Sequence, residues 1–379
     1  MRVFAVVAPG LEPFLIRELQ DLGFSIPTLP AGSDLPGDQS GGVEFEAGLE
    51  GIYRVNLMLR TASRILVRLG EFYTTAFWDL VKKASKLEWE RFLNAGQAVQ
   101  FRVACHRSRL YHSGAVAERV ADAIGARLGM PMSVTGTGAQ VSGEPPQLIV
   151  VRLASDRCTI SIDSSGEHLH RRGYRLGVAK APLRETLAAG MLFASGWDNL
   201  SPLTDPFCGS GTIPIEAALL ACKIPPGGKR AFAFQSWPGY QAELFDHLLQ
   251  EAWANVVLQT GSIAGFDRDA GAIRLAQENA TRAGVAGAIQ FSVQAFSHLS
   301  LDSPGWVVSN LPYGLRLKGG DLRNLYAQVG NVLRRRFAGW RFALLSNQHT
   351  LLDHTWLEIE RRLPFINGGM PVFLGIGEV

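Results

Sequence analysis

The sequence lacks the hallmarks of secreted, membrane-spanning and zinc-dependent proteins. Its 379 residues contain only four cysteines, Cys105, Cys158, Cys208 and Cys222, and no two of them form a CxxC pair. A disulfide framework or a cysteine-based zinc site is therefore not expected, and the eight histidines form no HExxH motif. No apolar run reaches the roughly 18 residues that span a bilayer, and residues 1–4 are unlike a signal peptide. We expect a cytoplasmic protein with no membrane partner and no metal.

Charge is also scarce. Charged residues make up 19% of the chain, apolar residues make up 47%, and the net charge is +3. This composition excludes a largely disordered chain and supplies the cores of two or three domains. The basic residues are 30 arginines and 7 lysines, a bias that we attribute to a GC-rich genome before selection for phosphate binding. Three basic clusters are compatible with nucleic acid, namely Lys82-Lys83-Lys86, residues 106–109 and residues 170–175.

The first 72 residues alternate short strand and helix patterns. Runs of β-branched or alternating residues predict three strands, and apolar residues at helical spacing predict two helices between them. The predicted strands are residues 3–7, 43–45 and 64–72, and the predicted helices are residues 11–22 and 49–59. A β-α-β-α-β order in so short a stretch is typical of a ferredoxin-like α+β domain, which we assign to residues 1–72.

A second α+β unit is predicted over residues 73–165. Its helix is predicted to start at Ser113, as the N-cap, and to end at Gly129, and its hairpin turns at Ser155-Asp156. The predicted elements are a strand at 99–105, the helix at 113–128 and hairpin strands at 147–154 and 158–163. The polar stretch 166–181 is interpreted as a linker.

From residue 182 onward, strands alternate with helices. This alternation predicts an α/β fold with a doubly wound, Rossmann-like sheet and ligand sites at the carboxyl ends of its strands. The predicted strands are residues 203–205, 263–267, 289–293, 306–309 and 341–345, the predicted helices are 213–222, 270–283 and 322–337, and the chain closes with an antiparallel hairpin of 357–363 and 371–376. We assign this domain to residues 182–379.

Two loops of the predicted sheet suit a cofactor. Residues 205–212, DPFCGSGT, join the first strand to its helix, where small residues let a ligand approach free N–H groups. Asp267 ends the next strand, after an insertion at 223–258, and its carboxylate can bind both hydroxyls of a ribose. The absence of GxGxxG and GxxxxGK[ST] disfavours dinucleotide and P-loop sites. Taken singly, the glycines could serve turn geometry, and either Asp267 or Asp269 could cap a helix.

Residues 309–314, SNLPYG, follow a buried strand pattern and suit an exocyclic amine. The side-chain carbonyl of Asn310 and the backbone carbonyl of Leu311 can accept its two N–H bonds and thereby orient the nitrogen lone pair. Pro312 fixes the turn, and Tyr313 offers a ring on which an extruded base can stack. An amine that attacks a cationic sulfonium needs no strong base, so positioning supplies most of the rate. The alternative for this motif alone is a structural Pro-Tyr-Gly turn.

Together with residues 168–175, HLHRRGYR, and 181–186, APLRET, these motifs resemble the THUMP-domain family of class I RNA methyltransferases. The RlmL-type 23S rRNA and TrmN-type tRNA guanine-N2 methyltransferases are the most similar branches. The resemblance covers nearly the whole chain. It implies a ferredoxin-like domain, a THUMP domain over residues 73–165 that binds structured RNA, and a methyltransferase domain that uses S-adenosyl-L-methionine (SAM).

The resemblance also implies roles for individual residues. Asp267, beside Arg268, would bind the cofactor ribose, and Arg184 would bind the methionine carboxylate. Relatives carry an acid for the adenine amine where this chain has Gln294-Ala295, so Gln294 or a backbone group would replace it. Asn310, Leu311, Pro312 and Tyr313 match the catalytic tetrapeptide, with leucine in place of the commoner proline. The remaining cofactor-binding residues would be Pro182, Thr186, Asp205, Phe207, Cys208, Gly209, Gly211 and Thr212.

The expected activity is SAM-dependent methylation of the N2 amine of a guanosine in structured rRNA or tRNA, by a monomer. One alternative is a DNA adenine-N6 methyltransferase, which uses the same amine clamp, but the N-terminal half favours RNA. The other is an RNA-binding assembly factor with a decayed site, which Ala295 favours and residues 310–313 oppose.

Overall fold

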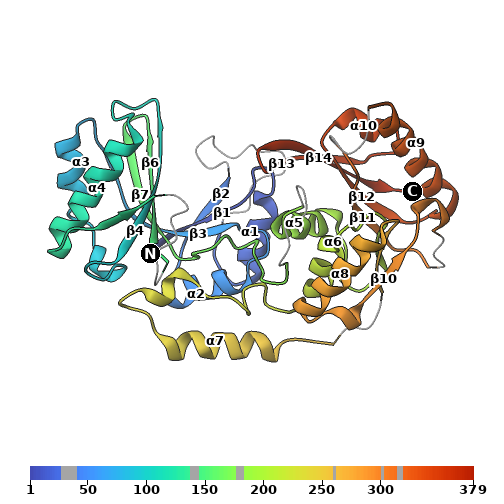
Figure 1. The fold of residues 1–379 in the computed structure, drawn as a ribbon, viewed down its shortest axis with the longest axis horizontal. Helices are drawn as coiled ribbons and strands as arrows, with labels where there is room; N and C mark the ends of the chain where they lie inside the picture. The colour runs from blue at the N-terminus through green and yellow to red at the C-terminus, as the bar shows by residue number, and fades with distance from the viewer. Residues whose placement is uncertain (27–40, 137–144, 176–182, 259–261, 300–302, 314–318) are drawn as a thin grey trace.

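The computed structural model describes residues 1–26, 41–136, 145–175, 183–258, 262–299, 303–313 and 319–379. Within these ranges the chain forms two seven-stranded sheets, one in each half (Figure 1). A continuous apolar core runs from the first sheet into helices of the second half. The α/β class predicted for the C-terminal half and the α+β class predicted for the N-terminal half are both confirmed.

The N-terminal sheet has the strand order β2-β1-β3-β7-β6-β4-β5. Its strands are β1 (Arg2–Val6), β2 (Gly42–Glu46), β3 (Arg64–Tyr73), β4 (Ala98–His106), β5 (Ser133–Thr135), β6 (Gln147–Ala154) and β7 (Arg157–Asp163). Its helices are α1 (Glu12–Asp21), α2 (Leu49–Met58), α3 (Phe77–Ala84) and α4 (Ser113–Leu128). The sequence patterns missed α3 and β5. The predicted cap Ser113 is wrong, because His112 occupies the N-cap position and Ser113 is already helical.

Strand β3 joins the two α+β units. It pairs with β1 from Arg64 to Val67 and with β7 from Leu66 to Tyr73, with a bulge between Arg68 and Gly70. The two units therefore share one sheet. The boundary at residue 72 stays a prediction, since β3 belongs to both units.

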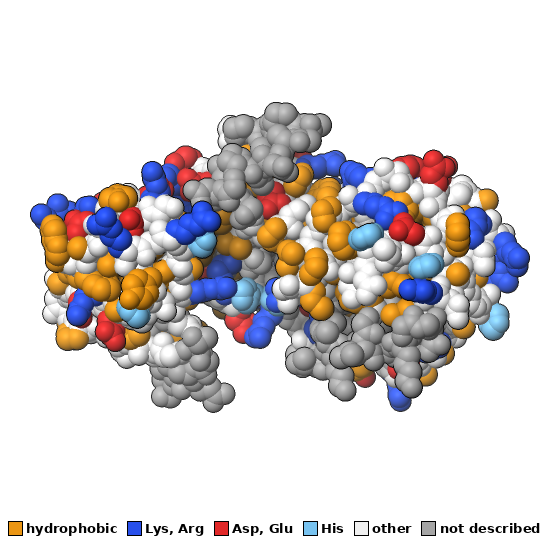
Figure 2. Space-filling view, turned by 90° about the horizontal axis from the view of Figure 1, so that it is seen from above, with side chains coloured by type: hydrophobic (Ala, Val, Ile, Leu, Met, Phe, Trp, Pro, Cys, Tyr) orange, Lys and Arg blue, Asp and Glu red, His pale blue; other side chains and the backbone are white. Residues whose placement is uncertain are grey.

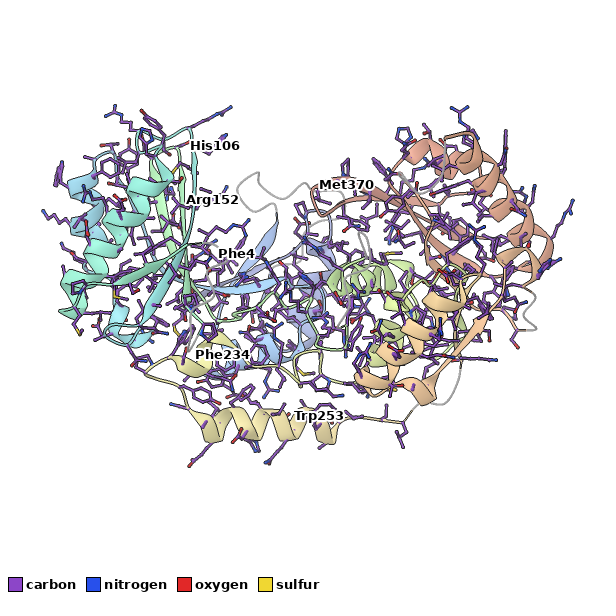
Figure 3. The ribbon with its side chains drawn as sticks, in the orientation of Figure 1. Phe4, His106, Arg152, Phe234, Trp253 and Met370 are labelled. Atoms are coloured by element: carbon purple, nitrogen blue, oxygen red, sulfur yellow. The ribbon has the colours of Figure 1, made fainter. Side chains whose placement is uncertain are left out.

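One face of the second unit's sheet is covered by α3 and α4 (Figure 1), and no described helix covers the other face, which is called the open face below. Side chains alternate along a strand, so Ile149 and Val151 of β6 are buried while Arg152 is exposed. Arg102 and His106 of β4 lie on the same open face as Arg152. Figure 3 shows His106 and Arg152 on the side of the sheet that faces the C-terminal half.

The C-terminal sheet has the order β10-β9-β8-β11-β12-β14-β13. Its strands are β8 (Leu203–Asp205), β9 (Ile263–Asp267), β10 (Ile289–Val293), β11 (Trp306–Asn310), β12 (Arg341–Ser346), β13 (Arg361–Asn367) and β14 (Met370–Glu378). The first five in this order are parallel, and β14 pairs antiparallel with β12 and β13. The order reverses at β8, so a ligand site is expected at the carboxyl ends of β8 and its neighbours.

Helices cover both faces of this sheet. Helices α5 (Glu185–Ser195), α6 (Thr212–Ala221) and α8 (Ala270–Ala283) lie on one face, and α9 (Gly319–Arg336) and α10 (His349–Asp353) lie on the other (Figure 1). Alternate residues of β12 divide between the two cores: Ala343 and Leu345 join one, and Phe342 and Leu344 join the other. The doubly wound sheet and the closing hairpin are confirmed, although β13 begins at Arg361, later than predicted.

The insertion at 223–258 packs on the N-terminal half. It carries α7 (Ala242–Ala254), which lies under α2 (Figure 1). The Phe234 and Tyr53 rings stack with centroids 4.4 Å apart, and Trp237 Nε1 donates to Gln147 Oε1 at 3.0 Å. Figure 3 shows Phe234 and Trp253 on this lower side. The insertion therefore attaches the C-terminal half to the first sheet.

Buried charges complete the joint between the halves. Arg60 donates to the carbonyls of Leu219 (3.2 Å) and Ile224 (2.7 Å) at the end of α6. Arg172 donates to the Arg60 carbonyl at 2.5 Å and lies 3.6 Å from the Glu216 carboxylate. Burial lowers the pKa of Arg60 to about 10. Because Arg172 is only 5% exposed, the interpretation of cluster 170–175 as a nucleic-acid surface is wrong for this residue.

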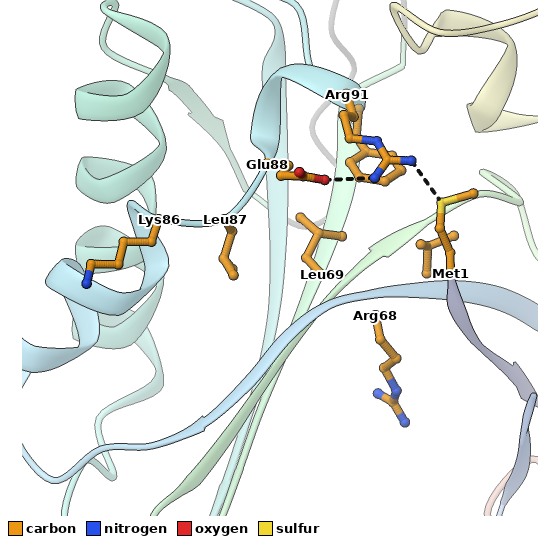
Figure 4. A pocket seen from close by; sticks show the side chains of 9 residues that line it. Met1, Arg68, Leu69, Lys86, Leu87, Glu88 and Arg91 are labelled. Atoms are coloured by element: carbon orange, nitrogen blue, oxygen red, sulfur yellow. Dashed lines mark hydrogen bonds and ion pairs between the residues drawn. The ribbon is translucent and has the colours of Figure 1, made fainter. Parts of the chain in front are cut away.

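A pocket in the N-terminal half lies apart from the predicted site. It is lined by Met1, Arg68, Leu87 and Arg91 among others, and Arg91 is held there by Glu88 at 2.7 Å (Figure 4). It includes none of the residues predicted to act in catalysis. Across the ranges described above, no helix has both the length and the apolarity to cross a membrane.

Candidate active site at the carboxyl edge of the C-terminal sheet

Asp205 connects the glycine turn to the neighbouring strand. Its Oδ1 accepts hydrogen bonds from Ser309 Oγ at 2.6 Å and from the Phe207 N–H at 3.1 Å. Burial raises the pKa of Asp205 to about 7, and the nearby charge of Asp267 adds to the rise. Because Asp205 is only 2% exposed, it lies beneath the turn. It holds the ends of β8 and β11 together, and its predicted role in cofactor binding stays a prediction.

The two glycines of the turn serve different purposes. Both have left-handed backbones, with φ of +53° at Gly209 and +85° at Gly211. A Cβ at Gly211 would lie 2.9 Å from Ala276 Cβ, so packing against α8 requires glycine there. At Gly209 a Cβ would meet no described atom within 4 Å, so this side of the turn is open to a ligand. Thr212 begins α6.

Cys208, between Asp205 and Gly209 in the chain, is a buried packing residue. It is 6% exposed, and its N–H donates to the Phe266 carbonyl at 2.9 Å. Burial, with the charges of Asp205 and Asp267, raises the thiol pKa well above its ordinary value. A thiol of this kind is no nucleophile.

Asp267 faces the glycine turn. Its carboxylate accepts from the N–H of Gly209 at 3.0 Å and from the N–H of Asp269 at 3.0 Å. Asp269 caps α8 by accepting from Gly271 N at 2.7 Å, so the capping alternative for Asp267 is wrong. The half-buried Asp267 carboxylate retains lone pairs for ribose hydroxyls, while Arg268 is exposed.

The region predicted to hold an adenine has an apolar wall. The side chain of Gln294 donates to the His298 carbonyl at 3.1 Å, and Ala295 precedes a short 3-10 turn. Phe296, in that turn, packs against Phe207 with ring centroids 5.5 Å apart. Sequence reasoning missed Phe296, although its aromatic side chain directly follows Ala295.

Asn310 carries a buried acceptor at the end of β11. Its Oδ1 has no hydrogen-bond partner among the described residues, and such atoms are rare in folded proteins. The Oγ of the neighbouring Ser309 donates to Asp205, so the predicted amine clamp and the glycine turn follow adjacent strands. Leu311 is buried and donates to the Leu345 carbonyl at 3.2 Å. Pro312 and Tyr313 are half-buried.

The start of α5 reaches the glycine turn through Arg175, which sequence reasoning did not assign to the site. Arg175 donates to Thr212 Oγ1 and, at 3.3 Å, to the Leu183 carbonyl, and it lies 3.5 Å from Glu185. Its only signal was its place in the HLHRRGYR segment. Arg184 is exposed and Thr186 is buried, and Pro182 lies outside the described residues.

Three family models match successive parts of the chain. They describe an RlmL ferredoxin-like domain at residues 2–66, a THUMP domain at 75–163 and an RMKL-like methyltransferase domain at 172–370. The chain belongs to the THUMP-domain RlmL-like methyltransferase family.

Curated members of this family are similar along the whole chain. The ribosomal RNA large subunit methyltransferase K/L of Methylococcus capsulatus is 36% identical over 97% of this chain and 50% of its own length. The chain thus spans about half the length of the K/L relatives. A putative RNA methyltransferase of Synechocystis is 33% identical over 98% of this chain and 95% of its own.

Solved structures have the same architecture. SMU.472, a putative methyltransferase complexed with S-adenosylhomocysteine (SAH), superposes with a TM-score of 0.87 at 28% identity, covering 100% of this chain and 97% of that one. TrmN from Thermus thermophilus has a TM-score of 0.73 at 21% identity, covering 100% and 99%, and shows the shared fold.

Proposed function

We propose that this family member transfers the methyl group of SAM to the N2 amine of a guanosine in structured RNA, with large-subunit rRNA as the first candidate. The observation that supports this most directly is the buried Oδ1 of Asn310, for which the described residues provide no hydrogen-bond partner. A buried acceptor without a partner carries a free-energy cost that a donor from a ligand would remove, and an exocyclic amine would supply two N–H groups. The Leu311 carbonyl would accept the second.

The residues at the strand ends fit SAM. Gly209 leaves its side of the turn open, and Asp267 presents a carboxylate held by two N–H groups. Asp267 would bind the ribose, and the Phe207–Phe296 wall would pack against the adenine. When bound, SAM supplies an electrophilic methyl group on a sulfonium.

In this proposal the residues of the chain accelerate the reaction by positioning the substrate. Asn310 and Leu311 orient the amine lone pair, and Tyr313 stacks on the extruded base. No buried base is required, because the amine loses its proton after the attack.

The open sheet face of the N-terminal half supports RNA as the substrate. Arg102, His106 and Arg152 lie on it, and basic side chains line the border between the halves (Figure 2). The K/L relatives named for ribosomal RNA favour rRNA over tRNA. A predicted N6-adenine-specific DNA methylase of Listeria monocytogenes is 31% identical with a TM-score of 0.87, so DNA remains the alternative to be tested.

The deciding experiment offers the full chain both nucleic acids. Tritiated SAM is incubated with total RNA from cells that lack the gene and, separately, with genomic DNA, and the nucleosides are then resolved. We expect label in N2-methylguanosine of rRNA. Label only in N6-methyladenosine of DNA would replace the proposal by the alternative.

Calorimetry with SAM tests the assembly-factor alternative. We expect saturable binding, and no heat at millimolar SAM would indicate a decayed site.

A further inference from the structure

The hairpin of β13 and β14 ends in a two-glycine turn beside the proposed catalytic loop. Gly368 and Gly369 have φ of +58° and +89°, which a tight two-residue hairpin turn requires. Asn367 and Met370 stand directly opposite each other on either side of that turn. The turn itself adds no side chain, so the outermost side chains of the tip are those of Asn367 and Met370.

The hairpin is anchored to both halves. Phe365 and Val372 are buried near its end, and Arg361 donates to the Ala194 carbonyl at 2.6 Å. A Cβ at Gly10, in the loop between β1 and α1, would lie 2.2 Å from the Pro364 carbonyl oxygen. The two backbones therefore touch, and the position of the tip is fixed relative to the N-terminal half.

The tip contacts the aromatic ring that would stack on the substrate. Asn367 is 8% exposed, and its Nδ2 donates to the Tyr313 hydroxyl at 3.4 Å. Opposed residues in an antiparallel pair share one face, so the Met370 side chain lies on the same face as Asn367. Unlike Asn367, Met370 is 46% exposed. Figure 3 shows Met370 where the hairpin reaches toward the N-terminal half.

We propose that Met370 contacts the RNA beside the target nucleotide and fills the space that this nucleotide leaves in the base stack when it turns toward Asn310. This inference rests on the proposed function. Apolar side chains that enter a base step support unstacking, and an unbranched thioether adapts to an irregular gap. Asn367 is the positioning residue, since it holds the Tyr313 ring on which the extruded base stacks.

The test uses a synthetic RNA hairpin with the sequence around the guanosine that the full chain methylates, located by mass spectrometry of nuclease fragments of the labelled rRNA, in which 2-aminopurine replaces that guanosine. This base keeps the exocyclic 2-amine and becomes brighter when it leaves the stack. We expect the full wild-type chain with SAH to raise the fluorescence, Met370→Ala to lose most of that rise, and Met370→Leu to keep it. On unmodified RNA, Met370→Ala should lower kcat/KM about tenfold.

Leu275→Ala is the matched control, because Leu275 is an apolar side chain of similar exposure, 48%, on α8. Leu275→Ala should change neither the fluorescence rise nor kcat/KM. Met370→Ala and Leu275→Ala should both unfold at the wild-type temperature. A wild-type rise that Met370→Ala retains in full would overturn the inference and leave the proposed function intact. No rise with the wild-type chain would also overturn the inference, whereas the proposed function is overturned only by the absence of label in N2-methylguanosine.

Discussion

The two sheets of this protein differ in the part that a ligand can reach: a face in the N-terminal sheet, and the carboxyl ends of the strands in the C-terminal sheet. The N-terminal sheet leaves one face open, and along it Arg102 and Arg152 are spread over neighbouring strands. The C-terminal sheet has described helices on both faces, and Asp267 and Asn310 end β9 and β11 at its carboxyl edge. A face offers charge over a wide area, which suits a backbone of phosphates. An edge gathers loops at one point, which suits the alignment of two reacting groups.

The strongest test of this contrast is Asn310→Ala, which removes the proposed clamp from the edge. Turnover should fall about a thousandfold, because positioning of the amine supplies most of the rate. SAM affinity, measured by calorimetry, should stay within a few-fold. Asn331→Ala, on α9, is the control, since Asn331 is exposed and bonds Arg334. A loss of SAM binding in Asn310→Ala would place Asn310 in the cofactor site.

The two halves should unfold together in one cooperative step, because buried charges join them. Arg172→Ala leaves Glu216 as an uncompensated buried charge, so the free energy of unfolding should fall by about 3–5 kcal/mol. Arg171→Ala removes only an exposed pair with Glu167, which is worth about 0–1 kcal/mol. Urea unfolding followed by two probes measures both. If the two halves unfolded in separate steps, the joint would be weaker than its contacts indicate.

The open face should account for the salt dependence of RNA binding. In the full chain, Arg102→Ala should weaken RNA binding and reduce the slope of log K against log salt by about 1. Turnover at saturating RNA should not change. Arg127→Ala is the control, because Arg127 pairs with Glu90 on the helical side. Equal effects from the two variants would remove the distinction between the faces.

The smallest expected effect is on the unfolding temperature at acidic pH, through His170 between the two halves. Burial, with the charges of His168 and Arg184, lowers the pKa of His170 to about 3, below the ordinary 6.5. The neutral ring therefore contributes stability above pH 6.5, and this contribution is lost as the pH falls toward 3. His170→Gln should lose less unfolding temperature between pH 7.5 and pH 5 than the wild type. An equal loss would mean that His170 titrates alike in both states.

The sequence predicted those parts of the fold in which local chemistry and tertiary packing agree. Gly129 and Gly284 end α4 and α8 in left-handed conformations, as their place after apolar-periodic stretches indicates. The parallel topology placed the DPFCGSGT and NLPY loops on adjacent strands, and the Ser309–Asp205 bond joins them. The cofactor and clamp roles of these residues remain predictions.

The unpredicted parts depend on long-range packing. Helix α5 is buried nearly all round, so it lacks the amphipathic period that marks a surface helix. Arg172 and Arg175 are arginines that the sequence places on a surface by default, and only the fold shows that carboxylates and carbonyls enclose them. The packing of α7 under α2 has no local signal at all.

Strand β3 has a consequence for substrate choice. One ten-residue strand, with a bulge between Arg68 and Gly70, serves two units, and the buried charges behind it hold the open sheet face and the carboxyl edge of the second sheet at a fixed separation. For an RNA substrate this separation acts as a length filter. Under the proposed function, a guanosine would reach the edge only when the folded RNA places it at the matching span from the bound segment, so the shape of the RNA, more than the sequence around the target, would select the nucleotide.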